Sequence, residues 1–199
     1  MDDTIKQELT GWTDNIVSVH LPRWDELPEI DLYMDQVVVF SERVFSRFPG
    51  IFSGKLISPA IINNYVKLGI IAQPVKKKYS RSHIASLIMI CILKQVLPIS
   101  AITDLIAYQL ETDEMAEVYN SFCAAQEAAT ASAVQSARAR FLDEERSSRK
   151  ISRDGRYDES VGLALEMAVT ANSSKIIAEK IIALKRNQEL APDAEKAEE

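Results

Sequence analysis

The residues best suited to binding chemistry in this chain are basic. Lys76, Lys77, Lys78 and Arg81 fall within six positions, and Tyr79 lies among them. Clustered lysine and arginine side chains neutralise phosphates and release the counterions that surround a nucleic acid. Tyrosine hydroxyls donate to phosphate oxygens. The cluster therefore predicts a surface that binds a polyanion, although a solvated turn would show the same lysine run.

The cluster belongs to a longer basic stretch, residues 55–108. This stretch has seven basic residues and one acidic residue, a net charge of +6, whereas the other residues have 16 and 28, a net charge of −12. A basic block within an acidic protein favours nucleic acid as the ligand. Asparagine pairs bidentately with adenine, so Asn63 and Asn64 are candidates for contacts with base edges. The expected DNA-binding residues are Lys55, Asn63, Asn64, Tyr65, Lys67, Lys76, Lys77, Lys78, Tyr79 and Arg81. Tyr65 also fits a core position.

Catalytic and metal-binding patterns are missing from the sequence. His20 and His83 have no potential catalytic partners near them in sequence, and Cys91 and Cys123 are too isolated to indicate a disulfide framework or a zinc site. There is neither a glycine-rich phosphate loop nor a nucleophile elbow. We therefore expect no enzyme activity, no metal and no cofactor.

Composition indicates a soluble, mainly helical chain. Hydrophobic residues make up 47% of the 199 residues and charged residues 26%, which is ordinary for a globular protein with a buried core. The longest apolar run, residues 84–93, is about half the length of a membrane-spanning helix. The acidic start of the chain is unlike a signal peptide. These features predict a cytoplasmic protein without a membrane contact.

The first half of the chain divides into short elements. Residues 1–30 are expected to form an N-terminal arm, extended over residues 1–20 and irregular over 21–30. Apolar residues at helical spacing predict a helix over 31–48. Ser58-Pro59 predicts the start of a second helix, and Gly69 predicts its end. Residues 73–79 predict a two-stranded hairpin or wing. Ser80 and Ser100 are the expected caps of two further helices, separated by a break at Leu97-Pro98.

Long helices are expected in the second half. One is predicted over 113–149, and its alanine-rich face would let another helix approach closely. Its length of about 50 Å exceeds what a small body needs, which predicts that part of its surface meets a partner subunit. A second is predicted over 158–187, with an interruption at Asn172-Ser173-Ser174. Residues 111–187 would thus form a dimerisation or signal-receiving region, followed by a disordered acidic tail over 188–199.

The order of these elements resembles a winged helix-turn-helix. The residues that carry the resemblance are Ser58, Ile62-Asn63-Asn64-Tyr65, Gly69-Ile70-Ile71, Pro74, Lys77-Lys78-Tyr79, His83-Ile84, Leu87 and Pro98-Ile99-Ser100-Ala101-Ile102. They are similar to the DNA-binding domain of the MerR-type regulators. The opening LPRWDELPEIDLYMDQVV, together with INNYVK and KKKY, is similar to an uncharacterised bacterial family, a domain of unknown function with MerR-like helices.

This resemblance covers about residues 20–110 and implies a mainly α fold. It implies a MerR-like winged helix-turn-helix over 31–110 with a small β wing, followed by long C-terminal helices. The chain departs from the MerR pattern at two places. Asn63 occupies the position of the family's phosphate-binding arginine, and the turn at residues 49–57 is longer than the usual tight turn.

Three functions fit these observations. The first is a transcriptional regulator that binds double-stranded DNA through the second helix and the basic wing, as a homodimer joined by its C-terminal helices. The second is a protein-interaction adaptor that uses the MerR-like scaffold without sequence-specific DNA binding; the acidic remainder and the two departures favour it. The third is a sensor that binds a small-molecule effector between its C-terminal helices.

Overall fold

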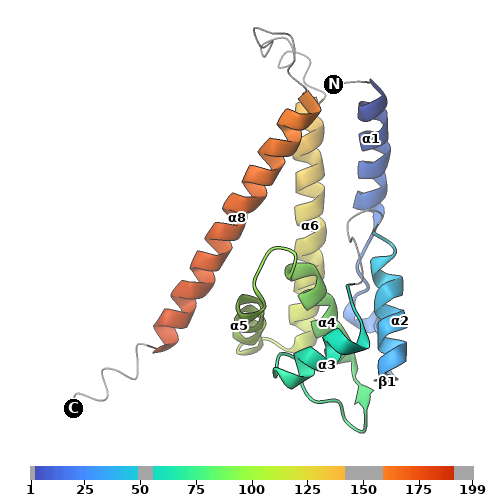
Figure 1. Ribbon diagram of the computed structural model, residues 1–199, viewed down its shortest axis with the longest axis vertical. Helices are drawn as coiled ribbons and strands as arrows, with labels where there is room; N and C mark the ends of the chain where they lie inside the picture. The colour runs from blue at the N-terminus through green and yellow to red at the C-terminus, as the bar shows by residue number, and fades with distance from the viewer. Residues whose placement is uncertain (1–2, 49–55, 142–158, 191–199) are drawn as a thin grey trace, which may run out of the picture. The chain divides into compact units, whose positions relative to one another are not determined.

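The computed structural model describes residues 3–48, 56–141 and 159–190 (Figure 1). Within these ranges the protein has seven α-helices and one two-stranded sheet, which confirms the expectation of a mainly α fold. Its contacts divide the chain into two compact units. One comprises residues 1–21 and 124–174, and the other comprises residues 22–123 and 175–199.

The basic stretch lies in the unit of residues 22–123 and 175–199. Its short elements are η1 (Trp24–Glu26), β1 (Leu32–Tyr33), α2 (Met34–Phe45), α3 (Pro59–Lys67), β2 (Lys78–Tyr79), α4 (Arg81–Leu93) and α5 (Ile99–Leu110). The beginning of α6 (Met115–Phe141) and the end of α8 (Glu159–Leu190) complete it.

Helix α4 forms the centre of this unit. The side chains of Ile84, Leu87, Ile88 and Ile90 are completely buried, and α4 packs against α2, α5 and β2. After its polar first turn, the helix is buried from Ile84 to Ile92 except at Ser86, which fits its nearly continuous apolar sequence. Burial raises the pKa of the Cys91 thiol to about 11, so this thiol is protonated at neutral pH.

The two ends of the segment 22–123 are hydrogen-bonded to each other. The backbone N–H of Trp24 donates to Asn120 Oδ1 at 2.9 Å, and Cys123 Sγ lies 3.8 Å from the carbonyl oxygen of Pro22. Asn120, as an acceptor, and Cys123, as a donor, thus hold the segment that leads into η1 against α6. The entry of the unit and its exit onto α6 are therefore adjacent.

Helix α3 begins and ends where its local sequence predicts. Ser58 is its N-cap, and its side chain accepts a bond from the backbone N–H of Ile61 at 3.3 Å. Pro59 is the first helical residue, where its missing N–H costs no bond. Gly69 follows the helix with φ of +72°, a left-handed conformation that glycine adopts without a steric penalty.

Loss of the Ser58 cap should destabilise the protein. Ser58→Ala leaves the Ile61 N–H without its acceptor and is expected to lower the free energy of unfolding by about 1 kcal/mol. Urea denaturation followed by circular dichroism measures this change. Ser121→Ala, at an exposed position of α6, is the matched control and should change stability by less than about 0.5 kcal/mol. Equal stability of the two variants would contradict the role of the cap.

The segment before α2 differs from its sequence prediction. Residues 32–33 are a strand rather than the start of a helix over 31–48, and the helix runs only from Met34 to Phe45. The hairpin or wing predicted within 73–79 is present as a tight turn closed by one antiparallel bridge between Val75 and Lys78. Strand β2 pairs antiparallel with β1, with Leu32 opposite Tyr79 and Tyr33 opposite Lys78. Pairing with a strand 46 positions away is a tertiary effect that local sequence does not encode.

Three further boundaries differ from the predictions. The N-cap of α5 is Pro98 instead of Ser100, which lies inside the helix. Helix α8 continues through 172–174 to Leu190, so residues 188–190 are helical instead of part of a disordered tail. The hydroxyls of Ser173 and Ser174 donate to the carbonyls of Val169 and Thr170 at 3.0 Å, which satisfies these side chains within the helix. The predicted helix over 113–149 is α6 as far as Phe141; its remainder and residues 191–199 lie outside the described residues.

The unit of residues 1–21 and 124–174 begins with α1 (Asp3–Ser18), where an extended arm was predicted. Thr13 and Ile16 are buried, with exposed fractions of 2% and 6%. Arg138 on α6 donates to the Thr13 hydroxyl at 2.7 Å and to Asp14 at 2.6 Å. The inner face of α1 is thus partly polar, which is why apolar periodicity did not reveal it. The alanine face of α6 at Ala125, Ala129 and Ala133 is exposed.

None of the described helices combines the length and the apolar character needed to cross a bilayer.

Candidate nucleic-acid interface

The lysine cluster forms a tight turn between Val75 and Lys78. The Lys78 N–H donates to the Val75 carbonyl at 2.9 Å, and the same two residues form an isolated β-bridge. Lys76 and Lys77 occupy the two central positions with φ of 51° and 64°. Two left-handed central residues are typical of the hairpin turn that matches strand twist. Both lysine side chains are exposed, so the turn presents two positive charges to solvent.

The small sheet anchors this turn to the core. Residues that face each other across an antiparallel pair share one face of the sheet. Leu32 and Tyr79 lie on the inner face, with exposed fractions of 8% and 3%. Tyr33 and Lys78 lie on the outer face, where Lys78 Nζ is 5.3 Å from the centroid of the Tyr33 ring. The inner face thus holds the turn in place while the outer face stays accessible.

Helix α4 begins directly after the sheet and is fixed to it. The backbone N–H of Ser80 donates to His83 Nδ1 at 3.0 Å, as predicted for a cap at Ser80. The ring of His83 meets the edge of the Tyr79 ring, with 5.5 Å between their centroids. The histidine therefore serves as a helix cap beside β2 and has a structural role in this position.

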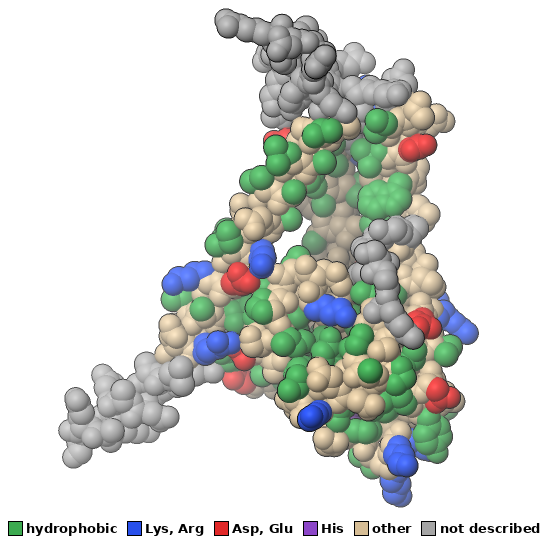
Figure 2. Space-filling model, in the orientation of Figure 1, with side chains coloured by type: hydrophobic (Ala, Val, Ile, Leu, Met, Phe, Trp, Pro, Cys, Tyr) green, Lys and Arg blue, Asp and Glu red, His purple; other side chains and the backbone are tan. Residues whose placement is uncertain are grey.

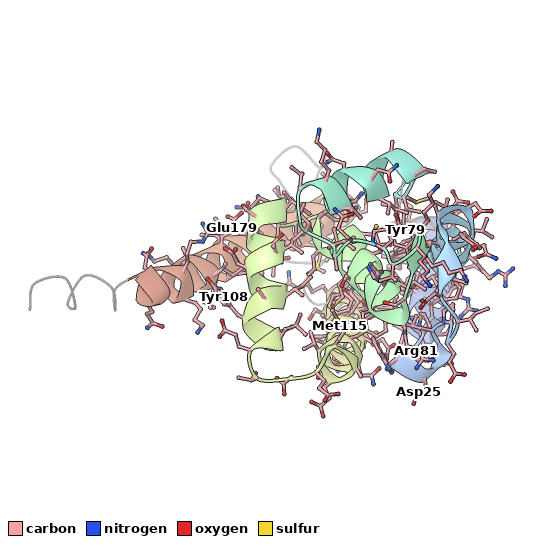
Figure 3. All side chains as sticks on the ribbon, turned by 90° about the horizontal axis from the view of Figure 1, so that it is seen from below. Asp25, Tyr79, Arg81, Tyr108, Met115 and Glu179 are labelled. Carbon is pink, nitrogen blue, oxygen red and sulfur yellow. The ribbon has the colours of Figure 1, made fainter. Side chains whose placement is uncertain are left out.

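Arg81 lies on the first turn of α4 and is half-exposed. Its guanidinium carbon is 5.5 Å from the centroid of the Trp24 ring. Figure 3 shows Arg81 beside the segment that carries Asp25, the residue after Trp24. Stacking on an aromatic ring orients the guanidinium and leaves its edge available for a phosphate.

Helix α3 contributes exposed polar residues at the same end of this unit as the β2 turn (Figure 1). Asn63, Asn64 and Lys67 are exposed. Tyr65, on the opposite side of the helix, is buried with an exposed fraction of 9%, and burial raises its pKa. Lys55 lies outside the described residues.

The structure therefore separates the candidate site residues into two groups. Tyr65 and Tyr79 are buried and support the surface; for Tyr65 this is the core position that the sequence also allowed, and for Tyr79 it differs from the expected contact with phosphate. The exposed or half-exposed group consists of Asn63, Asn64, Lys67, Lys76, Lys77, Lys78 and Arg81. Lys94, which also adds to the charge of the basic stretch, donates to the carbonyl of Leu56 at 2.9 Å and holds the entry to α3.

The basic charge is concentrated on α3, β2 and α4, whereas Asp25, Asp31 and Asp35 on the neighbouring segments are exposed. The sequence has no acidic residue between Lys55 and Thr103, so α3, β2 and α4 carry only positive charges. At the end of the molecule where the β2 turn lies, Figure 2 shows basic side chains next to apolar ones. Two aromatic residues outside the expected DNA-binding set, Trp24 and Tyr33, lie under these basic groups. Only the pairing of β1 with β2 could have revealed Tyr33.

The described ranges contain no group of three or more His, Cys, Asp or Glu side chains that could hold a metal ion. The thiols of Cys91 and Cys123 are both buried and unpaired with each other.

These features define a mainly helical domain with a two-stranded sheet and a basic turn. The model of the family described as "Domain of unknown function (DUF1836)" matches residues 22–122, which is about half of the chain. The chain belongs to this family. Comparison with curated proteins and with solved structures gave no match.

Proposed function

We propose that this chain is a transcriptional regulator that binds double-stranded DNA through α3 and the basic turn at residues 75–78. The exposed turn at Lys76 and Lys77 carries this proposal, because both lysines project from a surface without acidic residues in α3, β2 or α4. A positive turn of this kind contacts phosphates, while the asparagines of α3 offer hydrogen bonds to base edges.

The order of the elements supports the same proposal. Strand β1, α2, α3, β2 and α4 follow the order of a winged helix-turn-helix, in which the second helix enters the major groove and the wing contacts the backbone. The resemblance to MerR-type regulators in residues 58–102 points in the same direction. Asn63, in place of the arginine of that family, is exposed on α3 and would contact DNA as a neutral donor and acceptor.

Salt-dependent binding to duplex DNA tests the proposal. Affinity for a pool of random-sequence duplexes should fall steeply as salt rises, because each phosphate contact releases a counterion. Lys76→Ala with Lys77→Ala should reduce the slope of log affinity against log salt by about 2. Lys6→Ala with Lys180→Ala removes the same charge from α1 and α8 and should leave the slope unchanged. Absence of binding to any duplex at low salt would refute the proposal.

We also propose that the protein is a homodimer joined through α8. Between residues 175 and 190, Ile176, Ile177, Ile181 and Leu184 are each 49–61% exposed. The same part of α8 meets α5 through charged residues, since Arg186 bonds Asp104 and Lys185 Nζ lies 3.6 Å from Glu111. Ile182 is also buried on this side, so α8 uses its charged residues and one isoleucine for contacts within the chain and leaves its exposed apolar residues for another chain. A dimer would place two α3 helices on a near-palindromic site.

The adaptor function is the second candidate. The net charge of −6 and the exposed alanine face of α6 favour contacts with protein over DNA. Affinity capture that recovers a protein partner, with no DNA retained at low salt, would support this function over the first. A small-molecule effector stays a prediction from the sequence, and a thermal-shift screen against metabolites tests it.

A further inference from the structure

We infer that Tyr33 is a DNA-contacting residue and that it acts together with Lys78 and Val75 as one surface on the outer face of the sheet. This inference rests on the proposed function and assigns a contact that the sequence did not indicate. The ligand of this surface is the sugar–phosphate backbone of duplex DNA. The three side chains come from strands and turn positions that the register of the sheet brings together.

The register places the three residues in one row. Tyr33 is opposite Lys78 in the β1–β2 pair, and Lys78 is opposite Val75 in the bridge that closes the turn. Residues directly opposite each other project to the same face. Leu32 and Tyr79 fill the other face, which is buried. The row therefore faces solvent as a unit.

Exposure shows that this row has no cover within the described unit. Tyr33 is 51% exposed and Val75 is 68% exposed, although both are large apolar side chains. Tyr33 and Val75, on either side of Lys78, offer two apolar surfaces to a sugar. Lys78 offers a positive charge to a phosphate. Lys76 and Lys77 continue the positive charge around the turn.

The contact between Lys78 and Tyr33 gives the row its geometry. The ammonium nitrogen lies 5.3 Å from the ring centroid, so the ring restrains an otherwise flexible lysine over its face. An ammonium and a hydroxyl at adjacent positions can donate to oxygens of the same phosphate. Asp31 and Asp35 each lie two positions from Tyr33 and would repel a phosphate. The positive charges lie on the other side of the row, at the turn, so we expect the DNA backbone to contact only the row and the turn.

We expect variants of Tyr33 to keep the fold, so that a change in their DNA affinity reports on the lost side chain. At the start of α2 its backbone N–H donates to Gln36 Oε1 at 2.9 Å, and this bond does not depend on the side chain. Tyr33→Phe removes the hydroxyl alone, and Tyr33→Ala also removes the ring beneath Lys78. Tyr108 provides a matched control, because Lys185 Nζ lies 5.3 Å from the centroid of its ring on α5.

The experiment is a binding titration of random-sequence duplex DNA at several salt concentrations. Tyr33→Phe should weaken binding about tenfold at each concentration, through the loss of a hydrogen bond to a charged oxygen. Its salt slope should equal that of the wild type, because no charge is removed. Tyr33→Ala should weaken binding further, and Tyr108→Phe should bind as the wild type does.

Two other outcomes have separate meanings. If both Tyr33 variants bind like the wild type while Lys76→Ala with Lys77→Ala flattens the salt slope, the inference is wrong and the proposed function stands. If the wild type binds no duplex at low salt, the proposed function fails and the inference fails with it. Circular dichroism melting of each variant shows that the fold is retained.

Discussion

Replacement of Lys76 by Asn and Lys77 by Gly is expected to stabilise the protein and to weaken its binding to DNA. Both lysines have positive φ, and a left-handed conformation costs a residue with a side chain roughly 1–2 kcal/mol. Asn-Gly is the favoured pair at these two positions. The free energy of unfolding should therefore rise by about 1–2 kcal/mol, as measured by urea denaturation. DNA affinity should fall because two phosphate contacts are lost.

A variant with the same charge but a different backbone preference separates these two effects. Lys76→Ala with Lys77→Ala also removes two charges, yet alanine has no preference for the left-handed region. Its DNA affinity should match that of the Asn-Gly variant, whereas its stability should not rise. If the two variants are equally stable, the left-handed conformation of Lys76 and Lys77 does not lower the free energy of unfolding. If the Asn-Gly variant binds DNA like the wild type, the turn is not a DNA contact.

Ile177→Asp with Ile181→Asp is expected to convert the proposed dimer to a monomer. These side chains are 60% and 61% exposed, so two carboxylates cost little in a monomer but would be buried and unpaired between two α8 helices. Size-exclusion chromatography with light scattering measures the mass directly. Affinity for a duplex with two half-sites should fall by about 100-fold or more. In a monomer the second half-site is no longer bound by a subunit that the dimer contact holds nearby.

Asn187→Asp is the matched control for this substitution. Asn187 is an exposed polar residue of the same helix, and a charge there should leave both mass and DNA affinity unchanged. Helix content measured by circular dichroism should be the same in the variants and the wild type. A wild-type protein that is already a monomer at micromolar concentration would overturn the dimer proposal.

Local sequence was sufficient where a single residue decides the backbone. Ser58, Pro59 and Gly69 define α3 because capping, a fixed φ and a left-handed φ each depend on one residue and its near neighbours. The continuous apolar character of α4 likewise predicted a buried helix. The basic turn followed from charge alone, since lysine is rarely buried. These elements supply most of the exposed candidate site.

The predictions failed where distant segments decide the structure. Tyr33 was assigned to a helix because its apolar neighbours have helical spacing, but pairing with Lys78 makes it a strand residue. Helix α1 was missed because its inner face includes Thr13, whose hydroxyl accepts from Arg138 on α6. Tyr79 and Tyr65 are buried because of packing around α4, which the sequence of the turn and of α3 does not specify.

The adjacent ends of the family segment have a consequence for how the domain is used. Trp24 and Asn120 are hydrogen-bonded, and Pro22 and Cys123 are in contact, so the chain enters and leaves this domain at one place. A domain closed in this way can be inserted into another protein without separating the host residues on either side of it. The DUF1836 segment therefore joins the preceding and the following chain at one place, while the end of α8 returns to it through the contact of Arg186 with Asp104.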